Sequence, residues 1–209
     1  MNDQKQQKKD IQLERRAIIS PLFLTVLMGI AYDRMLEVAH KSLLSGLIVN
    51  DLLLIATFLL VSMRFFIGNQ LYLVSDDFKK LKELAWLYDY FVITGQTICI
   101  VFLGNFSSVQ ANGYSSIGFL QFLLVLYVID VAWIISLVIL SKLFSYFRRP
   151  PESIPVKWAF LNTFLIFAII ILNFIVSDLY STTGLVWLLC LNLIGFIVDV
   201  VIVDHHDSL

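Results

Sequence analysis

Asp130 is the residue of this sequence whose type and position most suggest chemistry. It stands in the middle of a long apolar run, and no basic residue is expected at its depth in a membrane. An uncompensated carboxylate in hydrocarbon is costly, so it is expected to take up a proton or bind a cation. We predict a proton or cation site at Asp130. The alternative is a protonated Asp that joins helices by hydrogen bonds.

Three neutral polar residues, Gln96, Asn192 and Thr57, interrupt other apolar runs. They fall at about the depth of Asp130 when alternate runs cross the membrane in opposite directions. Buried amides and hydroxyls at this depth either line a path for ions or protons or join helices. We predict that they line such a path together with Asp130.

A group of inner charges, Arg64, Asp89 and Asp199, is expected near the cytoplasmic side. A guanidinium below the lipid headgroups needs a partner, and either carboxylate could provide one. We favour a structural ion pair, with the Arg64 side chain reaching toward the interface, over an inner gate or charge sensor.

An outer cluster is expected where the first two apolar runs meet the opposite side. Asp33 and Glu37 are four residues apart, so their charges repel unless Arg34, Lys41 or an ion lies between them. Asp51 is expected at the same depth. We favour an interfacial network of these residues over a mouth that attracts cations.

Enzyme, metal and cofactor signatures are absent from the sequence. It has no HExxH, GxSxG, GxxxxGK[ST] or dinucleotide-binding pattern. The run Asp204-His205-His206-Asp207 has no matching histidine on its side of the membrane and is expected to be a solvated tail. Cys99 and Cys190 are expected to be ordinary buried or lipid-facing thiols. We predict no enzymatic activity, no metal, no cofactor and no nucleic-acid partner.

The elements that must position these residues are membrane-spanning helices. Hydrophobic residues make up 59% of the 209 residues and charged residues 15%, against about 25% charged in soluble domains. A helix needs about 20 apolar residues to cross a bilayer. Six runs of suitable length are present: Ala17–Ala39, Leu44–Phe66, Ala85–Leu103, Ile117–Leu140, Trp158–Ser177 and Gly184–Val203. The hydrocarbon crossing of the first is expected to end near Tyr32, with a helical extension at the interface.

The sequence therefore predicts an all-α, multi-pass bundle of six spans over residues 17–203, with short tails at 1–16 and 204–209. Its orientation follows from Lys and Arg, which favour cytoplasmic loops. They gather in the N-terminal tail and after the second and fourth spans: Lys5, Lys8, Lys9, Arg15, Arg16, Lys79, Lys80, Lys82, Lys142, Arg148, Arg149 and Lys157. Both termini are thus predicted to be cytoplasmic, and the composition favours a bacterial inner membrane. The basic N-terminal tail is expected to contact anionic lipid headgroups of the lipid bilayer.

Two functions fit this pattern. The polar residues on successive spans favour an ion or proton channel or a small transporter, and six spans favour a homo-oligomer. The potassium-selectivity sequence Thr-Val-Gly-Tyr-Gly and an arginine ladder are absent. The alternative is a non-transporting accessory or effector subunit that a cytoplasmic protein controls, as in a bacterial stress or phage-defence system. Its docking surface would be the N-terminal tail with the loops Gly68–Glu83 and Ser145–Lys157.

Overall fold

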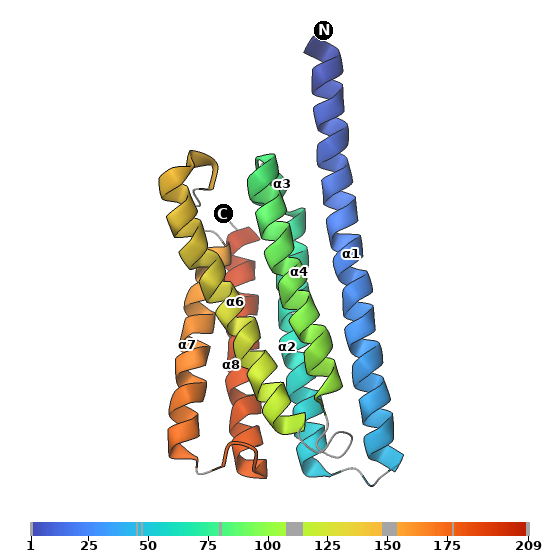
Figure 1. Ribbon diagram of the computed structural model, residues 1–209, viewed down its shortest axis with the longest axis vertical. Helices are drawn as coiled ribbons and strands as arrows, with labels where there is room; N and C mark the ends of the chain where they lie inside the picture. Colours follow the sequence, from blue (N-terminus) through green and yellow to red (C-terminus); the bar gives the residue numbers. More distant parts are fainter. Residues whose placement is uncertain are drawn as a thin grey trace.

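The described part of the chain folds into helices alone in a computed structural model (Figure 1). The structure describes residues 2–44, 46, 48–79, 81–107, 115–147, 154–176 and 178–207. The helices in chain order are α1 (Asn2–Leu44), α2 (Val49–Val74), α3 (Asp76–Lys79), α4 (Glu83–Asn105), α6 (Ser115–Leu143), the 3-10 helix η1 (Ser145–Phe147), α7 (Ile154–Ile175) and α8 (Thr182–Asp207).

Six of the described helices are long and apolar enough to cross a membrane, which confirms the predicted multi-pass bundle. Large apolar side chains on their outer faces remain exposed, as lipid-facing residues should be. Four of them are phenylalanines of α7: Phe160, Phe164, Phe167 and Phe174. The protein is therefore a membrane protein whose surface contacts the lipid bilayer.

The first two spans differ from their predicted bounds. α1 continues as a helix past Tyr32, as predicted, but it ends at Leu44 instead of Ala39. A turn through Gly46, whose φ is 90°, then leads to α2, which begins at Val49. α2 extends beyond Phe66 to Val74 because the polar residues that follow find partners inside the bundle. The Gln70 Nε2, for example, donates to the Pro21 carbonyl oxygen of α1 at 3.0 Å.

Two cytoplasmic connections were predicted between spans. The first, the loop Gly68–Glu83, is helical up to Val74 and again in α3. The second, the loop Ser145–Lys157, was predicted to end at Lys157, and this is wrong for its last part, since α7 already begins at Ile154. Pro155 falls in the first turn of α7, where the missing N–H has no helical partner to lose.

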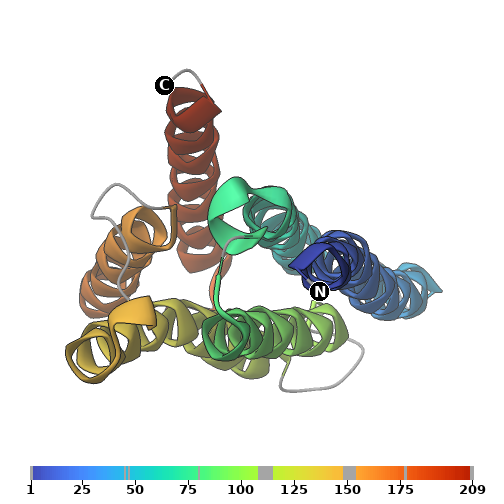
Figure 2. The same cartoon turned by 90° about the horizontal axis from the view of Figure 1, so that it is seen from above.

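The six long helices form a closed ring in the order α1, α4, α6, α7, α8 and α2 (Figure 2). Each packs against the next, and α2 returns to α1. α1 begins and α8 ends at the same end of the bundle, which also carries α3 at the top of Figure 1. Helices that are distant in sequence, such as α2 and α8, therefore become neighbours.

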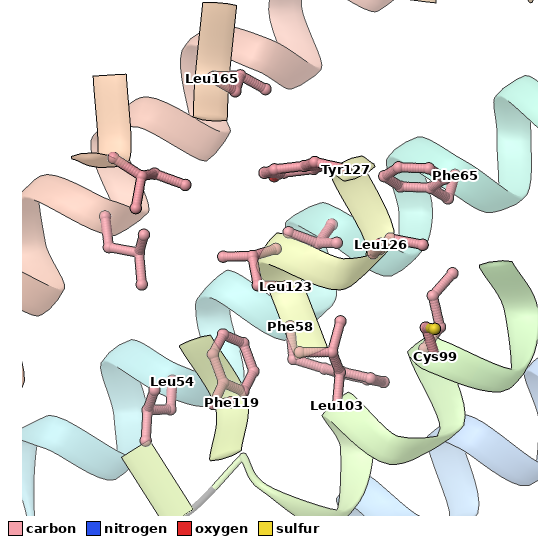
Figure 3. Packing of buried hydrophobic residues seen from close by; sticks show 14 of the residues in the cluster. Leu54, Phe58, Phe65, Cys99, Leu103, Phe119, Leu123, Leu126, Tyr127 and Leu165 are labelled. Atoms are coloured by element: carbon pink, nitrogen blue, oxygen red, sulfur yellow. The ribbon is translucent and has the colours of Figure 1, made fainter. Parts of the chain in front are cut away.

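Two apolar clusters fill the bundle. The upper cluster, near α3, consists of Leu24, Tyr72, Leu73, Phe78, Ala85, Ile93, Trp133, Leu137, Phe147 and Trp158. The lower cluster occupies the opposite end, and its largest members include Leu54, Phe58, Leu103, Phe119, Leu123, Leu126, Tyr127 and Leu165 (Figure 3). On each of α2, α4, α6 and α7, buried polar residues lie between the two sets. The clusters thus enclose a polar layer.

The crossing of α1 and α4 is close enough to require glycine. A Cβ built on Gly104 would lie 2.6 Å from the backbone oxygen of Ala31. We expect Gly104→Ala to lower the free energy of unfolding by about 1–3 kcal/mol, because the two backbones must separate. Thermal unfolding in detergent measures this. Gly95→Ala on the same helix is the control, since nothing lies within 4 Å of its Cβ position. Equal destabilisation by both substitutions would contradict the close crossing.

Candidate functional site

The polar layer is built around Arg64 of α2, which is 4% exposed. Its Nε donates to the Asp199 carboxylate of α8 in a buried ion pair. Its Nη2 donates to the Asn162 Oδ1 of α7 at 2.6 Å. The guanidinium also lies over the rings of Phe65 and Tyr127, 5.3 and 5.6 Å from their centroids, where ring faces attract a cation. Arg64 thus holds α2, α7 and α8 together.

Asp130 of α6 connects this ion pair to α4. The Asn162 Nδ2 donates to the Asp130 Oδ2, and the Gln96 Nε2 of α4 donates to the Asp130 Oδ1. The Asn69 Nδ2 of α2 then donates to the Gln96 Oε1 at 3.0 Å. Since Arg64 and Asn69 share α2, the bonds close a loop through α2, α7, α6 and α4. We call Arg64, Asn162, Asp130, Gln96 and Asn69 the polar ring.

A small cavity adjoins the polar ring at Arg64, Asn69 and Asp130. It has a volume of about 10 Å³, which is room for about one water molecule. Its lining residues are Arg64, Phe65, Gly68, Asn69, Asp130, Trp158 and Asp199. Two of its lining residues each carry a buried polar atom that has no hydrogen-bond partner among the described residues. These atoms are the Arg64 Nη1 and the Asp199 Oδ1.

Carboxylates outnumber cations in the interior of the described bundle. Arg64 is its one buried basic residue, and the buried acidic residues are Asp51, Asp89, Asp130 and Asp199. Asp130 and Asp199 both line the cavity beside Arg64. With both carboxylates ionised, the cavity carries one net negative charge. Such a charge is costly in a membrane interior and favours the uptake of a proton or a cation.

The sequence placed Asp130 at a depth without a basic residue, and the structure corrects this. Asp130 and Arg64 line the same cavity, and Asn162 bridges them. Of the two candidate partners, Asp199 is the one that pairs with Arg64. The predicted inner and midplane groups are therefore one network, because α2 and α8 bring their polar residues to the level of Asp130.

Asp89 binds to other side chains above the polar ring. It accepts hydrogen bonds from the Tyr72 hydroxyl at 2.6 Å and from the Trp133 Nε1 at 2.9 Å. All three residues are at most 2% exposed. Asp89 therefore lies against the upper apolar cluster, to which Tyr72 and Trp133 belong.

Two of the predicted path residues lie outside the polar ring. Asn192 accepts a hydrogen bond from the Tyr127 hydroxyl and donates to the Leu188 carbonyl oxygen at 2.8 Å. The Thr57 hydroxyl donates to the Leu53 carbonyl oxygen of its own helix at 2.8 Å. Gln96 is thus the member of that group that contacts Asp130.

The outer charges divide into two places. Glu37 accepts bonds from the Arg34 Nη1 at 3.1 Å and the Lys41 Nζ at 2.8 Å, all on exposed positions of α1. Asp33 is also exposed. Asp51 is instead fully buried and accepts a hydrogen bond from the Ser42 hydroxyl. The exposed charges thus lie along α1, whereas Asp51 joins the start of α2 to the end of α1.

Asn69 and Asn162 are the members of the polar ring that were not among the predicted site residues. Asn69 follows the predicted end of the second span at Phe66, and only the continuation of α2 brings it into the bundle. The sequence signal that could have identified Asn69 was the polar pair Asn69-Gln70 within a segment whose pattern is otherwise helical.

The C-terminal histidine tract lies outside the side chains that the structure describes. Among those it does describe, no group of three potential metal ligands is present. Comparisons of the chain with protein-family models, with curated proteins and with solved structures found no match. The functional argument therefore rests on the polar ring and its surroundings.

Proposed function

We propose that the protein is an oligomeric proton channel or small proton transporter in which Asp130 is the residue that binds the proton. One observation carries the proposal: a single buried guanidinium faces two buried carboxylates around one cavity. Arg64 compensates one negative charge, so a proton on the carboxylate pair makes the site neutral. Arg64 itself stays protonated, because a guanidinium does not release its proton in proteins.

The size and walls of the cavity favour a proton over a metal cation. A metal ion needs several oxygen ligands around it. The cavity has room for about one water molecule, and the Arg64 guanidinium forms part of its wall. A proton needs no such shell, since it binds to a carboxylate oxygen and can leave through a bridging water.

The apolar clusters above and below the polar ring fit a closed state of such a protein. They lie on either side of the polar ring along α2, α4, α6 and α7. A hydrophobic constriction keeps water out and can act as a gate. Transport then requires a movement that admits water past one cluster at a time or past both together.

Proton flux into liposomes tests the proposal. Purified protein is reconstituted into vesicles that contain a pH-sensitive dye, and a potassium diffusion potential drives protons inward. We expect the wild-type protein to acidify the vesicle interior. Asp130→Asn, which keeps the shape of the side chain, should slow the flux by about tenfold or more, a change of at least about 1.4 kcal/mol in the barrier.

Thr57→Val is the matched control, because the Thr57 hydroxyl is buried but bonds only to its own helix. It should leave the flux unchanged. Absence of flux from folded wild-type protein, or flux that Asp130→Asn does not alter, would overturn the proposal. Vesicles with a sodium or potassium gradient and no proton gradient test the metal-ion alternative. Chemical crosslinking in the same vesicles tests the proposed homo-oligomer.

A further inference from the structure

The hydrogen bonds at Asp130 have a direction, and this direction determines where a proton can go. Both carboxylate oxygens accept: Oδ1 from the Gln96 Nε2 and Oδ2 from the Asn162 Nδ2. An ionised carboxylate has only acceptors, so the observed arrangement suits the ionised form. When Asp130 gains a proton, one of its oxygens becomes a donor and needs an acceptor in place of an amide N–H.

The Asn162 side of Asp130 cannot supply that acceptor. The Asn162 Oδ1 accepts from the Arg64 Nη2 at 2.6 Å, and guanidinium groups have donors only. Turning the Asn162 amide over would point its NH₂ at the Arg64 guanidinium and leave two donors facing each other. The orientation of Asn162 is therefore fixed by Arg64 in both protonation states of Asp130.

The Gln96 side of Asp130 can supply an acceptor for the Asp130 hydroxyl. The partner of the Gln96 Oε1 is the Asn69 amide, which has both a donor and an acceptor. Among the described residues, Asn69 makes no other side-chain hydrogen bond, and it lines the cavity. If both amides turn over together, the Asp130 hydroxyl donates to the Gln96 Oε1, and the Gln96 Nε2 donates to the Asn69 Oδ1. The number of hydrogen bonds between Asp130, Gln96 and Asn69, which we call the Gln96–Asn69 arm, stays the same.

We propose that Gln96 and Asn69 form a reversible amide pair that turns over when Asp130 binds a proton, while Asn162 stays in place. The inference rests on the proposed function in taking Asp130 as the proton acceptor. The proton adds to the Asp130 Oδ1, and no other covalent bond forms or breaks. Gln96 and Asn69 are thus positioning residues, and they connect the charge of Asp130 to the cavity that Asn69 lines.

Other charged groups near Asp130 leave this asymmetry intact. On α2 and α8, Arg64 and Asp199 pair with each other. On α4, Asp89 is held by Tyr72 and Trp133. On α6 itself, the Tyr127 hydroxyl donates to Asn192 of α8. On α7, Asn162 is neutral and donates to the Asp130 Oδ2. The Gln96–Asn69 arm is therefore the side that can respond.

Infrared difference spectroscopy between alkaline and acidic buffer tests this inference on the full-length protein. Protein labelled with ¹³C at the glutamine side-chain carbonyl distinguishes the Gln bands from other amides. We expect a protonated-carboxyl band that is absent from Asp130→Asn. A shift of the labelled Gln carbonyl band should accompany it with the same pH midpoint, because Oε1 exchanges an amide donor for a hydroxyl donor.

Variants assign the labelled band. Gln96→Met should keep the carboxyl band and lose the Gln shift, whereas Gln70→Met, on α2 and bonded to α1, should keep both. In labelled wild-type protein, a carboxyl band without a Gln shift would overturn the inference, as would a Gln shift that survives in Gln96→Met. Loss of proton flux with these spectra intact would overturn the proposed function instead, so the two failures are distinguishable.

Discussion

Arg64→Leu is expected to lower the free energy of unfolding by about 3–5 kcal/mol, the usual cost of removing one partner from a buried ion pair. The substitution leaves the Asp199 carboxylate in the bundle interior without its cation. It also removes the donor to the Asn162 Oδ1. Unfolding in mixed detergent micelles, followed by circular dichroism, gives the measurement. Asp199→Leu should be less harmful, because the Asp130 carboxylate beside the same cavity still compensates the charge of Arg64.

The double variant Arg64→Leu/Asp199→Leu separates charge from general disruption. Removing both charges together avoids the uncompensated Asp199 carboxylate, so we expect the double variant to be more stable than Arg64→Leu alone. Thr57→Val on the same helix should change stability little. If the two losses instead add in the double variant, the ion pair is not what stabilises this part of the bundle.

Trp158→Ala is expected to change both the stability of the bundle and its permeability to protons. Trp158 is 6% exposed, belongs to the upper cluster and lines the cavity of the polar ring. Removing its ring should cost about 3–5 kcal/mol. It should also enlarge the cavity toward the upper end of the bundle and raise passive proton leak. Thermal unfolding and dye-monitored leak in liposomes give the two readouts.

Gly68 provides a compensating change for this variant. A Cβ at Gly68 would lie 2.6 Å from the Trp158 Cζ2, so the glycine makes room for the indole ring. Gly68→Leu alone should therefore destabilise the bundle, whereas in the Trp158→Ala background it should refill the space and restore part of the stability and the seal. Trp187→Ala is the matched control, since Trp187 is 53% exposed. An equal increase in proton leak with Trp187→Ala would contradict a specific role of Trp158 in excluding water from the cavity.

The six spans could be predicted from the sequence because apolar length alone decides whether a helix can cross a bilayer. Depth along each span gave the common level of Asp130 and Gln96, but it placed Arg64 at a different level, although Arg64 and Asp130 line one cavity. The order in which the six helices pack around the bundle could not be predicted, because apolar faces in lipid carry little information about their neighbours.

The membership of the polar ring was hidden for the same reason. Asn69 becomes part of the ring only because α2 continues past Phe66 and packs beside α4. Asn192 and Thr57, at similar predicted depth, turn instead toward Tyr127 and toward their own helix. Side-chain direction and helix order, which one sequence does not reveal, decide between these outcomes.

The ion pair between α2 and α8 has a consequence for biosynthesis. Arg64 and Asp199 are 135 residues apart in the chain. At translation rates of about 5–20 residues per second, roughly 7–27 s pass between the synthesis of the guanidinium and that of its carboxylate. During this interval the nascent chain holds a cation in the membrane without its final partner. A chain truncated before α8 lacks the Asp199 carboxylate permanently, so we expect it to be degraded faster than the chain that contains α8.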